Sequence, residues 1–145
     1  MTQLILGIDP GTRKCGYALV EAVRRPPVEL GIIVIEDLAS QLVSIARRYR
    51  PTSIALGGGT HAATIGAMLE VLEIPIEIVD ERATTLLARE RYFVANPPKG
   101  WRRLVPRGML LPPRPIDDFA AVLIAERLLI RLAADAARAA RPSLS

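Results

Sequence analysis

The sequence predicts an α/β fold in which a mixed five-stranded sheet is flanked by helices. The first three strand-like segments follow one another with no helix between them, which implies that the sheet starts with antiparallel strands. Helical and strand-like segments then alternate, which favours parallel strands. The chain has 145 residues, half of them hydrophobic, and can therefore bury the core of one ordinary domain. We expect a single domain over residues 1–145.

The three antiparallel strands are expected in the first 35 residues. Residues 4–9 form an apolar run that ends in a carboxylate, and residues 15–21 alternate as a strand does. A turn between them, residues 10–14, contains Pro and Gly. Two arginines and two prolines at 24–27 then break the chain, and residues 28–35 are predicted to form the third strand.

Helices and the two remaining strands are expected after residue 35. Apolar side chains at 38, 39, 42, 45 and 46 define one face of a helix over residues 36–50. Short strands are expected over 52–56, which ends in three glycines, and over 74–79. Further helices are predicted over 61–73, with Thr60 as the N-cap, from 82 or 83 to 92, and from 116 to about 140.

Composition excludes several classes of protein. One cysteine, Cys15, cannot form an internal disulfide, and with one histidine, His61, it excludes a zinc site of the usual ligands. No apolar run approaches the ~18–20 residues that cross a bilayer. The first residues show no basic flank and no signal-peptide cleavage site. We therefore expect a cytoplasmic location and no secretion. Carboxylate side chains are therefore better candidates for catalysis than a Ser–His or Cys–His pair, which would depend on His61 alone.

Positive charge is concentrated in one proline-rich segment. The chain carries +4 overall, but residues 89–115 hold seven basic residues and one acid, a net +6. The same window contains six of the twelve prolines and the only tryptophan, and its loop spans about residues 94–115. Such a segment indicates contact with a polyanion. The alternative is a solvated surface loop.

Acidic residues end two strands and open the last helix. Asp9 ends the first strand, Asp80 and Glu81 follow the last strand, and Asp117 and Asp118 open the final helix. Functional groups of α/β sheets gather beyond the carboxyl ends of the parallel strands, so these acids are expected to converge. A divalent cation would relieve their mutual repulsion, and oxygen ligands select Mg²⁺ or Mn²⁺. Two such ions can activate water and stabilise the leaving oxygen of a phosphodiester.

Each acid also has a purely structural interpretation. Asp9 could cap a turn, and the other four acids could cap the helices that follow them or favour their macrodipoles. Apolar residues at helical spacing follow both Asp117 and Asp118, so periodicity does not choose between these two.

Three motifs together resemble those of a known family. Residues 6–18, LGIDPGTRKCGYA, resemble the opening strand-turn-strand of the RNase H-like superfamily, in its YqgF branch and the related RuvC resolvases. Residues 79–85, VDERATT, resemble the YqgF signature Asp-Glu-Arg-x-Thr-Thr. Residues 116–124, IDDFAAVLI, resemble the closing helix of that family. The motifs occur in the family's order and span about residues 4–130.

The resemblance implies an RNase H-like fold and a nuclease that depends on Mg²⁺ or Mn²⁺. Members of the family are described as Holliday junction resolvase homologues or as nucleases that mature the small-subunit ribosomal RNA precursor. By position Asp9, Glu81 and Asp117 correspond to metal ligands, with Asp80 and Asp118 orienting the site or sharing ligation. The match thus favours Asp117 over Asp118.

The fourth strand departs from both relatives. RuvC carries an acid at its end, where this chain has Leu56 and glycines, which points to YqgF. The loop Gly-Leu-Pro-x-x-Met-Asp-Gly that follows this strand in YqgF proteins is replaced by Gly57-Gly58-Gly59-Thr60-His61. These glycines could present N–H groups to a phosphate or could serve only a tight turn.

Basic and aromatic residues are the candidate contacts to nucleic acid. Trp101 could stack on an unpaired base or pack the loop onto the core. His61 is interpreted as a surface or helix-start residue, and Cys15 as a packed small hydrophobe. The candidate contacts to DNA or RNA, each with surface charge or packing as the alternative, are Arg13, Lys14, Arg82, Lys99, Trp101, Arg102, Arg103 and Arg107.

Other functions are compatible with parts of the pattern. A catalytically inactive nucleic-acid-binding module of the same fold would bind without metal and show no turnover. A phosphotransferase or ATPase shares the Asp-Pro-Gly-Thr turn, but such enzymes generally need two copies of this domain. A homodimer would suit a four-way junction, and the sequence does not choose between DNA and RNA.

Overall fold

The structure is a computed structural model, and it describes residues 3–80, 84–105, 111–112 and 115–141. Its strands are β1 (Ile5–Asp9), β2 (Lys14–Val20), β3 (Glu29–Val34), β4 (Ser53–Gly57) and β5 (Ile76–Val79). Its α-helices are α1 (Ile35–Tyr49), α2 (Ala62–Leu69), α3 (Thr84–Ala95) and α4 (Asp117–Ala139). Two short 3₁₀ helices are η1 (Glu70–Leu72) and η2 (Gly100–Leu104).

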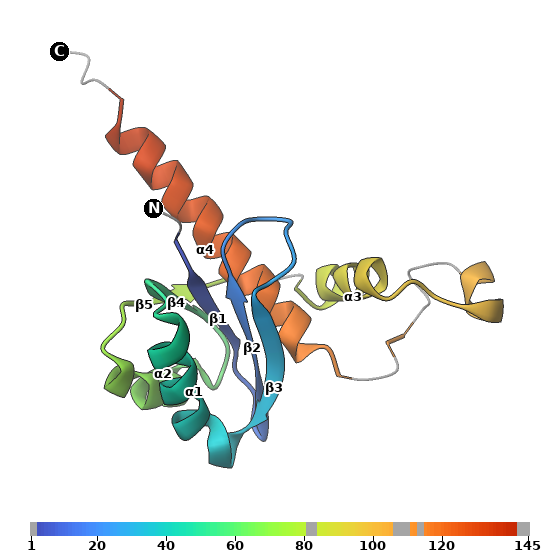
Figure 1. Ribbon diagram of the computed structural model, residues 1–145, viewed down its shortest axis with the longest axis horizontal. Helices are drawn as coiled ribbons and strands as arrows, with labels where there is room; N and C mark the ends of the chain where they lie inside the picture. Colours follow the sequence, from blue (N-terminus) through green and yellow to red (C-terminus); the bar gives the residue numbers. More distant parts are fainter. Residues whose placement is uncertain (1–2, 81–83, 106–110, 113–114, 142–145) are drawn as a thin grey trace.

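The five strands form one mixed sheet in the order β3-β2-β1-β4-β5 (Figure 1). β1 pairs antiparallel with β2, and β2 with β3. β1 pairs parallel with β4, and β4 with β5. This arrangement confirms the predicted fold class, and it places the carboxyl ends of β1, β4 and β5 at one edge of the sheet.

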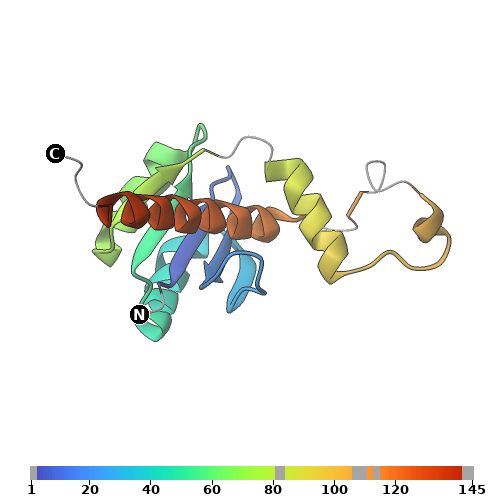
Figure 2. The same ribbon diagram turned by 90° about the horizontal axis from the view of Figure 1, so that it is seen from above.

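Helices cover both faces of the sheet. On one face, α1 and α2 bury their apolar sides against alternate residues of the strands, such as Leu6 and Ile8. On the other face, α4 packs against the residues between these, such as Ile5. Figure 2 shows α4 lying across this second face. Because successive side chains of the central strands point to opposite faces of the sheet, these strands contribute to two separate hydrophobic cores.

Two glycines allow α4 to lie directly on the strands. A Cβ atom on Gly7 of β1 would come within 2.2 Å of the carbonyl oxygen of Ala121. A Cβ atom on Gly16 of β2 would come within 2.0 Å of the carbonyl oxygen of Asp117. No other residue type fits at either position without movement of the helix, so these glycines set the height of α4 above the sheet.

The structure corrects the predicted boundaries of two helices. The N-cap of α2 is His61 and not Thr60, and it makes no side-chain capping bond. The helix changes to η1 after Leu69, and Glu73 then adopts a left-handed backbone with φ of 56°. α3 continues to Ala95, three residues beyond the expected end, because Asn96 bonds back to the carbonyl of Tyr92 before two prolines end the helix.

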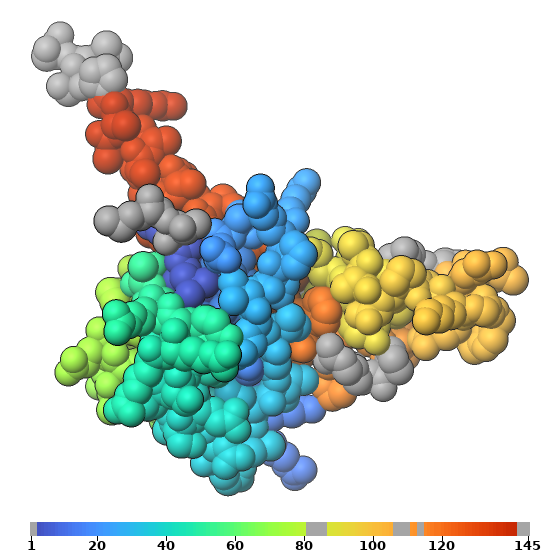
Figure 3. Space-filling view, in the orientation of Figure 1, coloured from blue at the N-terminus to red at the C-terminus, as the bar shows by residue number. Residues whose placement is uncertain are grey.

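Two segments extend beyond the sheet. α3 and η2, called here the arm (residues 84–105), project away from it, and α3 contacts the rest of the protein mainly through α4 (Figures 1 and 3). At its other end, α4 runs past its last fully buried residue, Leu128, and residues 133–141 are exposed. Within the described part of the chain, no helix is both long and apolar enough to cross a membrane.

Candidate functional site

Asp9 and Asp117 line the same cleft. Side-chain alternation along β1 puts Asp9 on the face that carries Ile5 and Gly7, which is the face covered by α4. The cross-strand partner of Asp9 is Gly16, and the first turn of α4 rests on that glycine. The two carboxylates therefore border one open cleft of about 180 Å³.

The buried thiol of Cys15 experiences the charge of both carboxylates. Burial is the largest cause that raises the pKa of Cys15 above its usual value, and the backbone of Gly11 opposes the rise through a hydrogen bond. The negative charges of Asp9 and Asp117 raise the pKa of this thiol further. Both carboxylates thus lie near this thiol, in a cleft that the basic residues Arg13 and Lys14 also line.

Asp117 and Asp118 have different surroundings. Asp117 is partly exposed and lines the cleft. Asp118 is only 4% exposed, and its carboxylate accepts a hydrogen bond of 3.0 Å from the backbone N–H of Phe119. Of these two neighbours, Asp117 is the residue that the structure places in the cleft with Asp9.

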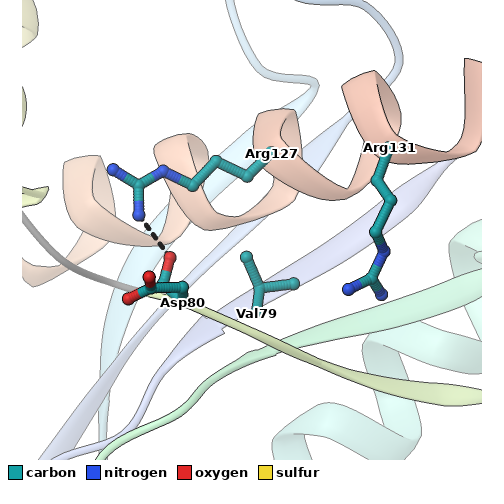
Figure 4. Close-up of a pocket in the computed structure, with 4 residues that line it drawn as sticks. All are labelled: Val79, Asp80, Arg127 and Arg131. Atoms are coloured by element: carbon teal, nitrogen blue, oxygen red, sulfur yellow. Dashed lines mark hydrogen bonds between the residues drawn. The ribbon is translucent and has the colours of Figure 1, made fainter. Parts of the chain in front are cut away.

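Asp80 lies in a separate cavity beside α4. The backbone carbonyl of Asp80 accepts a hydrogen bond from the guanidinium of Arg127, as Figure 4 shows. Val79, Asp80, Arg127 and Arg131 line this cavity of about 390 Å³. The structure thus ties the end of β5 to α4. Glu81 and Arg82 lie outside the described residues.

The donor set of the cleft suits a hard divalent cation in part. Asp9 and Asp117 offer carboxylate oxygens, the ligands that Mg²⁺ and Mn²⁺ prefer. Among the residues that the structure describes, no three His, Cys, Asp or Glu side chains lie close enough to hold a metal ion. The third predicted ligand, Glu81, lies outside that part of the chain.

The predicted nucleic-acid contacts fall into two groups. Arg13 and Lys14 line the cleft of Asp9 and Asp117. Lys99, Trp101, Arg102 and Arg103 lie at the far end of the arm, in or next to η2 (Figure 3). Arg107 lies outside the described residues.

Trp101 is 74% exposed, so the alternative in which it packs the loop onto the core is wrong. Its neighbour Arg102 donates a hydrogen bond of 2.6 Å to the carbonyl oxygen of Leu111. The exposed indole is available for stacking, and the segment that carries it is held locally by Arg102.

The glycines after β4 form a tight turn. The N–H of Gly58 bonds to the carbonyl of Val79 at 2.9 Å, and that of Gly59 bonds to the carbonyl of Gly57 at 3.0 Å. Both donors are therefore used within the protein, which agrees with the second interpretation of these glycines and not with phosphate binding.

His61 is closer to the site than its sequence context suggested. Its Nε2 atom shares a hydrogen bond of 3.0 Å with Oγ1 of Thr12, a residue that lines the cleft. His61 follows the glycine turn at the carboxyl end of β4, the sheet edge that also carries Asp9. That position beyond a parallel strand is the signal that could have identified it.

The strand order and the helices on both faces of the sheet define an RNase H-like fold. A solved structure of RuvC from T. thermophilus in complex with Holliday junction substrate superposes with a TM-score of 0.62 at 16% identity, over 91% of this chain and 96% of that chain. Another structure of Thermus thermophilus RuvC gives a TM-score of 0.58 at 12% identity, over 90% and 95%. These structures establish the fold.

The sequence is similar to curated bacterial nucleases. A candidate pre-16S rRNA nuclease of Pelotomaculum thermopropionicum is 29% identical over 86% of this chain and 85% of its own length. A protein of the same name from Azotobacter vinelandii is 27% identical over 86% and 91%. The crossover junction endodeoxyribonuclease RuvC of Heliobacterium modesticaldum is 37% identical over 37% and 40%. No family model matches the chain. These similarities confirm the predicted resemblance to YqgF proteins and to their RuvC relatives.

Proposed function

We propose that this protein is a nuclease that hydrolyses phosphodiester bonds in nucleic acid. The observation that carries the proposal is the convergence of Asp9 and Asp117 on one cleft of an RNase H-like fold. Curated proteins similar along most of their length are named for nuclease activity on pre-16S rRNA, which makes a ribosomal RNA precursor the first substrate to test. A four-way DNA junction is the second, because RuvC shares the fold.

Asp9, Asp117 and Glu81 would hold Mg²⁺ or Mn²⁺. When bound, such an ion supplies an activated water and stabilises the charge of the leaving oxygen. Asp9 is well placed because β1 is the central strand of the sheet. Asp117 is held by the contact of its backbone with Gly16. Asp80 and Asp118 would support the site, the first from the end of β5 and the second from within α4.

Arg13 and Lys14 would hold the phosphate groups of the substrate. Both line the cleft beside the two acids, so a phosphodiester in the cleft would meet positive charge at its non-bridging oxygens. The exposed Trp101 and the basic residues of the arm would contact a more distant part of the nucleic acid.

The test is cleavage of labelled single-stranded RNA, single-stranded DNA and a four-way junction with Mg²⁺, Mn²⁺ or EDTA. We expect cutting only with metal, and we expect Asp9→Asn to abolish it while binding persists. Asp37→Asn is the matched control, because Asp37 is an exposed acid at the start of α1. Cleavage retained by Asp9→Asn would refute the assignment of the site. Binding without cutting under every metal would favour the inactive binding module.

A further inference from the structure

A second cavity, apolar and rimmed by arginines, lies between the β2–β3 loop, α3 and α4. Its volume is about 410 Å³, within the range of about 300–1,000 Å³ that small-ligand sites occupy. Arg24, Arg25 and Arg91 supply its charged part, and its described lining contains no carboxylate. Its apolar walls include Pro26, Pro27, Leu30, Val94, Phe119 and Val122.

A buried carboxylate joins the three elements that form the cavity. Glu126 of α4 is 5% exposed and accepts two hydrogen bonds from Arg91 of α3, at 2.9 and 2.5 Å. It also accepts the backbone N–H of Arg24 at 2.8 Å. The walls are therefore held in place by charge-assisted bonds.

Arg24 occupies an unusual backbone conformation at the rim. Its φ is 61°, in the left-handed region that non-glycine residues seldom adopt. The bond to Glu126 holds it there, and its side chain is left exposed together with that of Arg25. Because Glu126 offsets the charge of Arg91, the mouth of the cavity keeps the positive charge of Arg24 and Arg25.

The cavity lies along α4 from the catalytic cleft. Phe119 of its wall is two residues beyond Asp117, and Glu126 is nine residues beyond it. At 1.5 Å per residue the basic rim lies about 13 Å further along the helix axis. A strand of a few nucleotides spans that length. The Phe119 ring is held at its place by an edge contact with Tyr92, with centroids 5.5 Å apart.

We propose that this cavity binds one unpaired nucleotide of the substrate strand, with its base on the apolar walls and its phosphate at Arg24 and Arg25. Apolar and aromatic surface next to guanidinium groups is the chemistry by which single strands are bound without base pairing. The proposal rests on the proposed nuclease function. It adds a preference for substrates that are single-stranded a few nucleotides from the cut.

Charge variants at the mouth test the proposal. Binding of a fluorescein-labelled single-stranded oligonucleotide is measured in EDTA, so that no cleavage occurs. Val94→Glu places a negative charge at the mouth, and Val71→Glu is its matched control, since the two valines are 70% and 67% exposed. We expect Val94→Glu to weaken binding about tenfold and Val94→Lys to strengthen it. Val71→Glu should stay within about twofold of wild type. Equal effects of the two Glu variants would overturn the proposal.

Two glycine variants separate the Arg24 side chain from its backbone. Arg24→Gly removes the guanidinium while glycine accepts the left-handed φ, so the fold is preserved. Arg50→Gly is the control with the same net charge, because Arg50 also has a positive φ of 51° at the end of α1. We expect a loss of several-fold in affinity for the first variant only, and a smaller loss on fully duplex nucleic acid. Losses that match on both substrates would overturn the proposal.

The outcomes distinguish this inference from the nuclease proposal. A protein that cuts with metal but shows no difference between the paired variants would refute only the nucleotide site. A protein that shows the differences but never cuts would refute only the nuclease. If sedimentation velocity shows a dimer that Val94→Glu dissociates with no change in oligonucleotide affinity, the cavity holds a second copy of the chain, and the nucleotide proposal is overturned.

Discussion

Substitution of Gly16 by Ala should disturb the site through the backbone alone. The added methyl carbon would lie 2.0 Å from the carbonyl oxygen of Asp117 and 2.6 Å from the backbone nitrogen of Asp118. Real Cβ contacts are not shorter than 3.0 Å, so the first turn of α4 must move by about 1 Å. Overpacking of this kind destabilises proteins by about 1–3 kcal/mol. A displacement of about 1 Å in a catalytic group can reduce the rate on the order of 100-fold.

Two assays check Gly16→Ala against a control glycine. Urea unfolding gives the loss of stability, and cleavage at saturating substrate gives the loss in kcat. Gly66→Ala in α2 is the control, because its new Cβ would lie 3.5 Å from the Cδ2 atom of Leu56, an ordinary van der Waals contact. Alanine is favoured over glycine inside a helix, so this control should be neutral or stabilising by up to about 1 kcal/mol. Wild-type stability and kcat for Gly16→Ala would refute the reasoning.

Three further predictions test other parts of the structure. Arg91→Ala should destabilise the protein by about 3 kcal/mol in urea unfolding, because it leaves the buried carboxylate of Glu126 without its ion-pair partner. The double variant Arg91→Met with Glu126→Leu, which removes both charges, should recover part of this loss. A double variant as unstable as the single one would contradict this. Burial and a hydrogen bond to a carboxylate raise the pKa of Tyr17 from 10.0 to about 12. Its neutral form therefore stabilises the fold fully below pH 10, and that contribution is lost as pH rises from 10 to 12. Tyr17→Phe should remove this part of the pH dependence, and an unchanged profile would refute it. Arg102→Ala with Arg103→Ala should weaken binding of the single-stranded oligonucleotide. The plot of log binding constant against log salt concentration should become less steep, its slope smaller in magnitude by about 1.4. An unchanged slope would show that neither residue contacts phosphate.

Elements with strong local patterns could be predicted from the sequence. The alternation of β1 and β2 reports burial on two faces, and the apolar positions of α1 repeat with the helical period. Ends of helices were predicted less well, because they depend on single contacts. The bond from Asn96 to Tyr92 that ends α3 has no counterpart in hydrophobic periodicity.

The sequence predicted the edge of the sheet at which the acidic residues gather, but not which of them line one cleft. Asp117 and Asp118 are equivalent in helical spacing. The resemblance to YqgF proteins favoured Asp117, and the packing of α4 on Gly16 is what places Asp117 in the cleft. The second cavity was not predicted at all. Its central bond joins Arg24 to Glu126, which are 102 residues apart, and such a pairing leaves no local pattern in the sequence.

The two ends of α4 are stabilised by different interactions, because only the first part of the helix is buried. Up to Leu128 its turns are held by burial, and they melt only with the core. Residues 133–141 are mostly alanine and contact little else, so their helicity depends on intrinsic propensity and on the pair of Asp135 and Arg138. Hydrogen exchange should therefore be fast in the last turns and slow in the first ones. Shortening the helix there would leave the end that carries Asp117 undisturbed, which makes the exposed end suitable for attaching a label or for immobilising the protein.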